Sequence, residues 1–426
     1  MSSDTRREGE TPVTNQLNTV ALDLQDERLI REAGVGGAIR AFIQRVRTGD
    51  LGPLPVIIGI VVIWGVFQAL NPFFLSARNL VNLTMDFSAV GVIALGIVLV
   101  LLLGEIDLSV GSVSGLAAAI LAVLFVNEGV WVGFAVIAAM LAGTAIGLTY
   151  GLLYTRFGVP SFVVSLAGLL AFLGAMLWVL GPLGTINIPF QSIVVQFGQQ
   201  IFLPDWLSYL VVAAFVLSYA GSQVWTGNRR TRAGLSAQTP TSIIVRTAAL
   251  ALVLLIIVWY LNQNRGIGLM PLVFVLLVIL FQTLLTRTRW GRSVYAVGGN
   301  VEAARRSGIR VDRIYISVFM LTSTLAALGG LFAAARLGAA NQGSGTADTN
   351  LNAIAAAVIG GTSLFGGRGS AYSALIGVVV IMSISSGLTL LNLDSYVRYV
   401  ITGAVLLLAV IVDSLSRRTR QASGRG

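Results

Sequence analysis

Two carboxylates in the segment GEIDLSVG, Glu105 and Asp107, are the residues of this chain best placed to do chemistry. They lie between long apolar runs, where an ionisable side chain is costly and typically serves a function such as a proton relay or a polar ligand path. Asp107 has a second role open to it, because its carboxylate can accept from the N–H groups of Ser109 or Val110 and cap a helix that starts at Leu108. On a regular helix these two carboxylates would point about 200° apart, so joint action requires an irregular segment.

The chain lacks the side chains on which much enzyme chemistry depends. It contains no cysteine and no histidine, and all 28 of its basic residues are arginine. Zinc sites, thiol nucleophiles, Ser-His-Asp triads and lysine Schiff bases are therefore excluded. The phosphate-binding loop GxxxxGK[ST] also needs a lysine, so ATP that powers this protein must bind to another subunit. We expect no cofactor, no metal and no catalytic residue.

The composition is typical of a polytopic membrane protein. Hydrophobic residues make up 56% of the 426 residues and charged residues 11%, with a mean hydropathy of +0.85, whereas a soluble domain has about 25% charged residues. A membrane span needs about 20 apolar residues in a helix. Twelve apolar runs approach or exceed that length, at about 54–70, 88–103, 109–126, 130–154, 161–181, 206–224, 243–261, 269–286, 314–336, 351–362, 371–391 and 396–413. Because several are short and rich in glycine, we predict an all-α protein with about 10–12 transmembrane helices.

The arginines indicate how the chain is oriented. With the N-terminus in the cytoplasm, inward segments hold 24 arginines and outward segments hold four, Arg78, Arg265, Arg336 and Arg398. Since the inward loops of membrane proteins are enriched in Arg and Lys, this ratio predicts that both termini are cytoplasmic. The net charge of +10 is therefore a mark of topology rather than of a nucleic-acid partner.

These patterns divide the chain into three parts. Residues 1–50 form a cytoplasmic segment with a basic amphipathic helix, residues 51–415 form the transmembrane domain, and residues 416–426 form a basic cytoplasmic tail.

The largest inward loop, TRTRWGRSVYAVGGNVEAARRSGIRVDRI (286–314), carries seven arginines against Glu302 and Asp312. Asn300 is a good N-cap for a short helix, and Gly308 can end that helix. A helix that projects into the cytoplasm suits the docking of a soluble motor, and an arginine-rich loop equally suits contact with anionic lipid. The residues alone leave both readings open.

Four segments of the chain resemble, in order, the conserved blocks of ABC importer permeases in the ribose/xylose/galactose branch. The segment EAARRSG (302–308) matches the EAAxxxG signature by which such permeases dock their ATPase, within the wider string GRSVYAVGGNVEAARRSGI (291–309). The other blocks are GEIDLSVGS (104–112), GVPSFVVSLAG (158–168) and GGTSLFGGRGS (360–370). The resemblance runs from about residue 55 to 415 and implies a type II-like importer permease fold.

The resemblance also implies the site residues and the partners. The ATPase-coupling loop would be residues 287–313, with Arg292, Gly298, Gly299, Asn300, Glu302, Ala303, Ala304 and Gly308 as its key positions. The residues themselves, rather than the resemblance, give the candidate substrate path, which comprises Glu105, Asp107, Ser109 and Asn352 as polar groups near membrane depth. An asparagine inside a span can bond a sugar hydroxyl, and it can equally hold two helices together. The partners would be a cytoplasmic ATPase subunit, an extracytoplasmic sugar-binding protein and a second copy of the chain, in a bacterial inner membrane.

The sequence departs from the family pattern in two places. The Ile-Leu-Pro end of the usual docking signature is absent, and residues 203–268 insert a pair of spans around the basic loop GNRRTRAG (227–234). Such an insertion resembles the xylose-type permeases, which favours D-xylose or a related aldose as the transported sugar. The alternative is an ion-coupled secondary sugar transporter, for which Glu105, Asp107 and Asp86 would be the relay.

Overall fold

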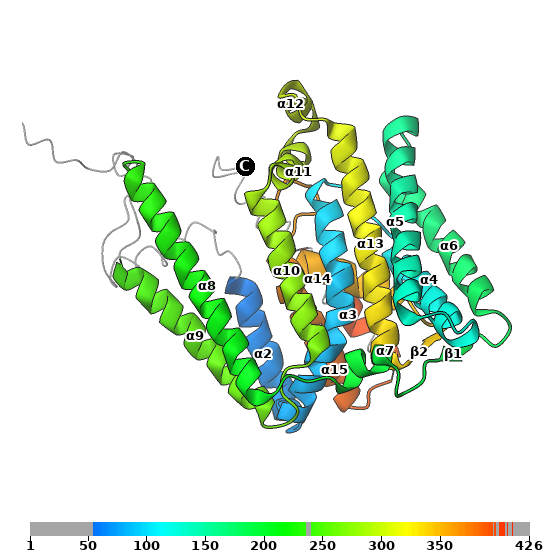
Figure 1. The fold of residues 1–426 in the computed structure, drawn as a ribbon, viewed down its shortest axis with the longest axis horizontal. Coiled ribbons are helices and arrows are strands. Elements are labelled where there is room, and N and C mark those ends of the chain that lie inside the picture. The colour runs from blue at the N-terminus through cyan, green and yellow to red at the C-terminus, as the bar shows by residue number, and fades with distance from the viewer. Residues whose placement is uncertain are drawn as a thin grey trace, which may run out of the picture. The chain divides into compact units, whose positions relative to one another are not determined.

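The computed structural model describes residues 54–235 and 240–394, together with residues 396, 397, 400–404, 407 and 411. This part of the chain is mostly helical, with two short strands (Figure 1). Within it, nine helices are long and apolar enough to cross a membrane. They are α3 (Ala77–Leu102), α4 (Val110–Ala122) continued by the π-helical turn η2 (Val123–Asn127), α5 (Val132–Phe157), α6 (Ser161–Leu180), α8 (Asp205–Arg232), α9 (Pro240–Asn262), α10 (Leu269–Arg287), α13 (Val311–Leu337) and α15 (Ala371–Leu390). The prediction of an all-α polytopic membrane protein is confirmed.

Two further helices that cover predicted apolar runs are shorter than a membrane span. Helix α2 (Leu54–Leu70) has 17 residues, and α14 (Ala347–Ile359), which covers most of the apolar run at 351–362, has 13. At 1.5 Å per residue α14 is about 20 Å long, too short to cross a hydrocarbon core of about 30 Å alone. The predicted N-terminal amphipathic helix and the basic tail lie outside the described residues, as does much of the run at 396–413.

Helix α3 begins eleven residues before its predicted apolar run. Ser76 is its N-cap and accepts a hydrogen bond from the N–H of Asn79 at 3.3 Å. Hydropathy missed these first turns because they carry Arg78, Asn79, Asn82 and Asp86. The cap starts the helix, and neighbouring segments supply hydrogen-bond partners for Asn79, Asn82 and Asp86.

The described chain divides into two compact units. Val211–Leu254, which holds most of α8 and α9, belongs to one unit, and the remaining described residues belong to the other. The predicted inserted spans at 203–268 therefore correspond largely to a helix pair with its own internal contacts. Everything described below lies in the larger unit.

Helix α13 packs against α3, α4 and α5 at the centre of the larger unit. Small residues allow these close crossings: a Cβ atom at Gly96 of α3 would lie 2.9 Å from the backbone oxygen of Thr322, and one at Gly147 would collide with the backbone of Phe319. The hydroxyl of Thr322 donates to the backbone oxygen of Gly96 at 3.0 Å. Glycine within these spans thus serves close helix packing.

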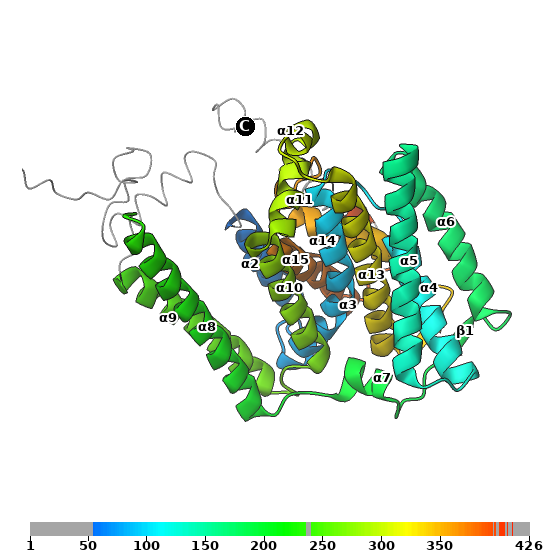
Figure 2. The ribbon, with the colours of Figure 1, turned by 45° about the horizontal axis from the view of Figure 1, so that its top comes forward.

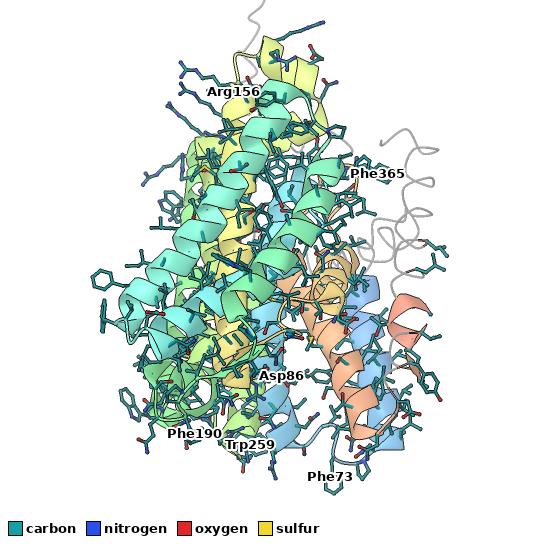
Figure 3. The ribbon with its side chains drawn as sticks, turned by 90° about the vertical axis from the view of Figure 1, so that its right-hand side faces the viewer. Phe73, Asp86, Arg156, Phe190, Trp259 and Phe365 are labelled. Carbon is teal, nitrogen blue, oxygen red and sulfur yellow. The ribbon has the colours of Figure 1, made fainter. Side chains whose placement is uncertain are left out.

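The larger unit has two distinct ends. Helices α11 (Arg289–Gly299) and α12 (Val301–Arg306) lie at one end, here named the α12 end, and the short helix α7 (Ile193–Val195) lies at the other (Figures 1 and 2). The opposite end also holds the π-helical turn η3 (Gln196–Gln200) and an antiparallel pair of strands, β1 (Thr185–Asn187) and β2 (Ala339–Asn341), and is named the β1 end. Figure 3 places Arg156 toward the α12 end, and it places Phe73, Asp86 and Phe190 toward the β1 end.

Candidate functional site

The predicted coupling loop folds into two short helices joined by a capped turn. Helix α11 ends at Gly299, and the side chain of Asn300 accepts a hydrogen bond from the N–H of Ala303 at 2.9 Å, which makes it the N-cap of α12. Gly308 follows the helix with a φ of +82°, a conformation that favours glycine. The predicted N-cap and the predicted helix end are both confirmed.

Helix α12 rests on the protein by one face. Ala304 is 4% exposed, whereas Glu302, Ala303 and Arg306 are exposed. Glu302 and Arg305 form an ion pair at 2.6 Å in which the two side chains remain 66% and 57% exposed. Such an exposed pair contributes little to stability, so these side chains are available to a partner.

Of the remaining key positions in the loop, some are exposed to solvent and others pack against the protein. Arg292 and Gly299 are exposed, and a Cβ atom at Gly299 would meet nothing within 4 Å. Gly298 lies directly against the backbone oxygen of Leu102, at the end of α3, and leaves no room there for a side chain.

Three of the four segments that resemble permease blocks meet at this point. The N–H of Gly367 donates to the backbone oxygen of Leu102 at 2.9 Å, and the hydroxyl of Tyr295 donates to the backbone oxygen of Gly369 at 2.8 Å. The break after α3, the coupling loop and the glycine-rich segment 360–370 therefore share one contact region.

A pocket of about 590 Å³ lies beside α12, and the fourth block, at 158–168, forms part of its wall. Glu105 faces this pocket from the irregular segment between α3 and α4. Its carboxylate accepts hydrogen bonds from the hydroxyls of Tyr154 at 2.7 Å and Ser161 at 2.6 Å. The other lining residues include Arg305 of α12 and Asp312 and Tyr315 of α13. Carboxylate, hydroxyl, guanidinium and aromatic groups together suit the binding of a small polar ligand.

Asp107 lies apart from this pocket and is fully buried. One carboxylate oxygen accepts from the N–H of Ser109 at 2.8 Å and from its hydroxyl at 2.7 Å. The hydroxyl of Tyr150 in turn donates to that of Ser109 at 2.9 Å. The predicted bond to the Ser109 N–H is present, but α4 starts at Val110 rather than at Leu108 and its N-cap residue is Ser109. Asp107 therefore stabilises the turn that precedes the helix, and the irregular backbone gives the two carboxylates different surroundings.

Asn352 contributes no lining atom to the pocket at Glu105. Its neighbour Asn350, two residues earlier on α14, is 5% exposed and donates from its side-chain amide to the backbone oxygen of Leu108. Sequence reasoning missed Asn350, together with Tyr154, Ser161 and Tyr315. Ser161 sits inside the block GVPSFVVSLAG, and Tyr154 follows Tyr150 by one helical turn, so both left a signal in the sequence.

Among the residues that the structure describes, no group of three or more Asp, Glu, His or Cys side chains is arranged to hold a metal ion.

Comparison with known proteins shows which family and which proteins this chain is similar to. Residues 79–410, well over half of the chain, match the family described as the branched-chain amino acid transport system permease component. The chain is 38% identical over 346 residues to the xylose transport system permease protein XylH of Escherichia coli (strain K12), which covers 81% of this chain and 87% of that protein.

Two other relatives align over similar lengths. XylH of Haemophilus influenzae is 36% identical over 385 residues, which is 88% of this chain and 99% of that protein. The ribose import permease protein RbsC of Escherichia coli (strain K12) is 33% identical over 361 residues, which is 84% of this chain and 92% of that protein. No solved structure matches the chain.

Proposed function

This chain belongs to the family of permease components of the branched-chain amino acid transport system, and from that premise we propose that it imports a pentose, D-xylose or a related aldose. It is a multi-pass membrane protein of the bacterial inner membrane and the permease subunit of an ABC sugar importer, not an enzyme. Relatives named for xylose and ribose transport support a pentose as the transported sugar. The two spans inserted at 203–268 favour xylose over ribose.

ATP is bound and hydrolysed by a separate cytoplasmic subunit that docks on α12. The observation that carries this assignment is the capped helix itself: it holds Glu302, Ala303 and Arg306 exposed, while the loop behind it packs on the end of α3 and on segment 360–370. A chain without lysine cannot build the GxxxxGK[ST] phosphate loop. ATP binding would switch the pore between outward and inward access through one surface. That surface is the coupling loop 287–313 with the positions predicted above, from Arg292 to Gly308.

The α12 end faces the cytoplasm on this proposal, as the distribution of arginine predicts. The pocket at Glu105 then opens toward the cytoplasm beside the coupling helix, which suits the inner part of the sugar path. Its carboxylate accepts from the hydroxyls of Tyr154 and Ser161 and could accept from sugar hydroxyls in the same way. Asp107 and Ser109 support the turn behind Glu105, and Asn352 is a weaker candidate for sugar contact.

The assembly contains two copies of this chain, since an ATPase pair needs two docking surfaces. A sugar-binding protein delivers the cargo on the outer side, and no nucleic acid is involved. Residues 51–415 are the permease domain, between the cytoplasmic segment 1–50 and the tail 416–426.

Purification from native membranes in mild detergent tests this proposal. We expect a stoichiometric soluble ATPase that contains GxxxxGK[ST], whose ATP hydrolysis D-xylose stimulates when the binding protein is added. If the chain is isolated alone under conditions that preserve other importer complexes, and sugar uptake follows an ion gradient, the secondary-transporter alternative replaces it.

A further inference from the structure

The coupling helix itself forms part of the wall of the pocket at Glu105. Val301 and Arg305 of α12 line this pocket, and Glu302, one helical turn before Arg305, is exposed on the same helix. A ligand in the pocket would therefore contact the element on which, in the proposed function, the ATPase docks.

Arg305 connects the pocket with the docking surface. Its Nη1 donates to a carboxylate oxygen of Glu302 at 2.6 Å, and both side chains stay more than half exposed. A guanidinium group carries five N–H donors, so Arg305 can hold Glu302 and a ligand in the pocket at the same time. Because an exposed ion pair of this kind is weak, the guanidinium group can also turn from Glu302 toward such a ligand at little cost.

The rest of the wall offers oriented acceptors and an aromatic surface. The carboxylate of Glu105 is oriented by the hydroxyls of Tyr154 and Ser161, and the centres of the Tyr154 and Tyr315 rings lie 4.5 Å apart. Tyr315 and Ser161 are only 4% and 7% exposed, so the packing of the protein holds both in place. A few oriented polar groups beside aromatic rings suit the binding of a small molecule with several hydroxyls.

The charges that line the pocket favour a neutral ligand. Among the described residues of its wall, Glu105 and Asp312 are carboxylates and Arg305 is the one cationic group, already paired with Glu302. A phosphorylated sugar would bring a charge of about −1.5 to −2 toward these carboxylates, and repulsion would oppose its binding. A free aldose meets no such repulsion, because its hydroxyls can donate to the carboxylates and accept from the guanidinium group.

We propose that the pocket at Glu105 is a regulatory site at which free D-xylose or a related aldose in the cytoplasm inhibits the importer. This inference rests on the proposed function, which supplies the orientation, the sugar and the docking of the ATPase on α12. An ATP-driven change that displaces α12 takes Val301 and Arg305 away from the wall, so a bound sugar favours the arrangement seen here. Such a ligand opposes the change by a factor of one plus the ratio of its concentration to its dissociation constant.

The consequence is feedback by the imported product. Because the pocket selects the free sugar over its phosphate ester, import slows when free sugar enters faster than phosphorylation or isomerisation removes it. The coupling is reciprocal: the ATP-driven displacement of α12 lowers the affinity of the pocket for the sugar by the same factor.

The test measures ATP hydrolysis by the permease–ATPase complex in nanodiscs without binding protein, while D-xylose is titrated up to about 100 mM. We expect hydrolysis to fall about tenfold at a sugar concentration about ten times the inhibition constant. Glycerol at the same osmolarity and the phosphate ester of D-xylose should leave the rate unchanged.

A matched pair of variants assigns the inhibition to the pocket. Arg305→Gln and Arg306→Gln each remove one positive charge from α12, and Arg306 is not among the described residues that line the pocket. The inhibition constant is referred to each variant's own rate without sugar, so that a change in docking does not enter. Loss of one charged hydrogen bond should raise this constant about tenfold in the Arg305 variant, whereas the Arg306 variant should stay within about twofold of wild type. Asp312→Ala, which leaves α12 intact, should also raise it about tenfold.

Hydrolysis that D-xylose does not inhibit would overturn the regulatory site, and so would equal inhibition constants in the Arg305 and Arg306 variants. Equal inhibition by the phosphate ester would overturn it as well, because the pocket would then not select a neutral ligand. A complex that D-xylose and the binding protein stimulate, but that D-xylose alone does not inhibit, refutes the site and leaves the proposed function standing. The absence of any ATPase partner refutes the proposed function and the site with it.

Discussion

Reversing the charge of Glu302 distinguishes an effect on the stability of α12 from an effect on its docking to the ATPase. In this structure Glu302 pairs with Arg305 at 2.6 Å while both side chains are more than half exposed. An exposed pair within one helical turn is worth about 0.3–0.5 kcal/mol. Glu302→Arg replaces this attraction by a repulsion of similar size, so the total cost to α12 is about 1 kcal/mol, roughly a fivefold effect.

A direct contact with the ATPase would be worth more. Removing one partner of a charge pair that an interface buries costs about 2–5 kcal/mol, so we expect Glu302→Arg to weaken ATPase binding at least thirtyfold. ATP-driven uptake should fall accordingly, while membrane insertion and thermal stability stay close to wild type. The dissociation constant of the ATPase from nanodisc-embedded permease, measured beside uptake, gives the result.

Asp394→Arg is the matched control, because it makes the same change of charge at another exposed carboxylate, outside the coupling loop. A Glu302→Arg variant that binds its ATPase within about fivefold of wild type would show that only helix stability had changed. The coupling role assigned to α12 would then be refuted.

Three other substitutions test neighbouring parts of the account. Gly308→Asp forces a side chain into a φ of +82° at a cost of about 1–2 kcal/mol and should weaken ATPase binding about tenfold; normal uptake would contradict this. Glu105→Gln should slow sugar transport about tenfold without altering ATPase binding, because it removes the charged acceptor of the pocket, and uptake at the wild-type rate would exclude Glu105 from the path. Asn350→Ala deletes a buried hydrogen bond to Leu108 and should lower stability by about 1–3 kcal/mol. Asn352→Ala should have a smaller effect on the melting temperature, and equal losses would be evidence against the packing role of Asn350.

The helices of this protein were largely predictable from hydropathy and capping. The apolar runs locate the spans, and Asn300 and Gly308 predict the limits of α12 because caps act within a few residues. Helix α3 shows where hydropathy fails: its first turns are polar, and their partners, such as Arg336 for Asp86, are distant in the sequence. The strand pair was not predictable for the same reason. Strands β1 and β2 have three residues each, and the packing of the helices that lie between them in the sequence brings them together.

The candidate site was predictable in part. The position of Glu105 and Asp107 between apolar runs identifies both as unusual. That Glu105 faces the pocket while Asp107 stabilises a turn depends on the irregular backbone between α3 and α4. Tyr154 and Ser161 become partners of Glu105 only when α5 and α6 are in place. The composition of the pocket is thus a property of tertiary packing, whereas the coupling helix is encoded locally.

Uptake of radiolabelled D-xylose into proteoliposomes tests the central claim most directly. The vesicles contain this chain and its ATPase, the sugar-loaded binding protein is added at the outer face of the permease, and ATP is supplied at its cytoplasmic face. We predict uptake that requires both ATP and the binding protein and that persists when ionophores collapse all ion gradients. Uptake that proceeds without ATP and stops with the ionophores would contradict the account.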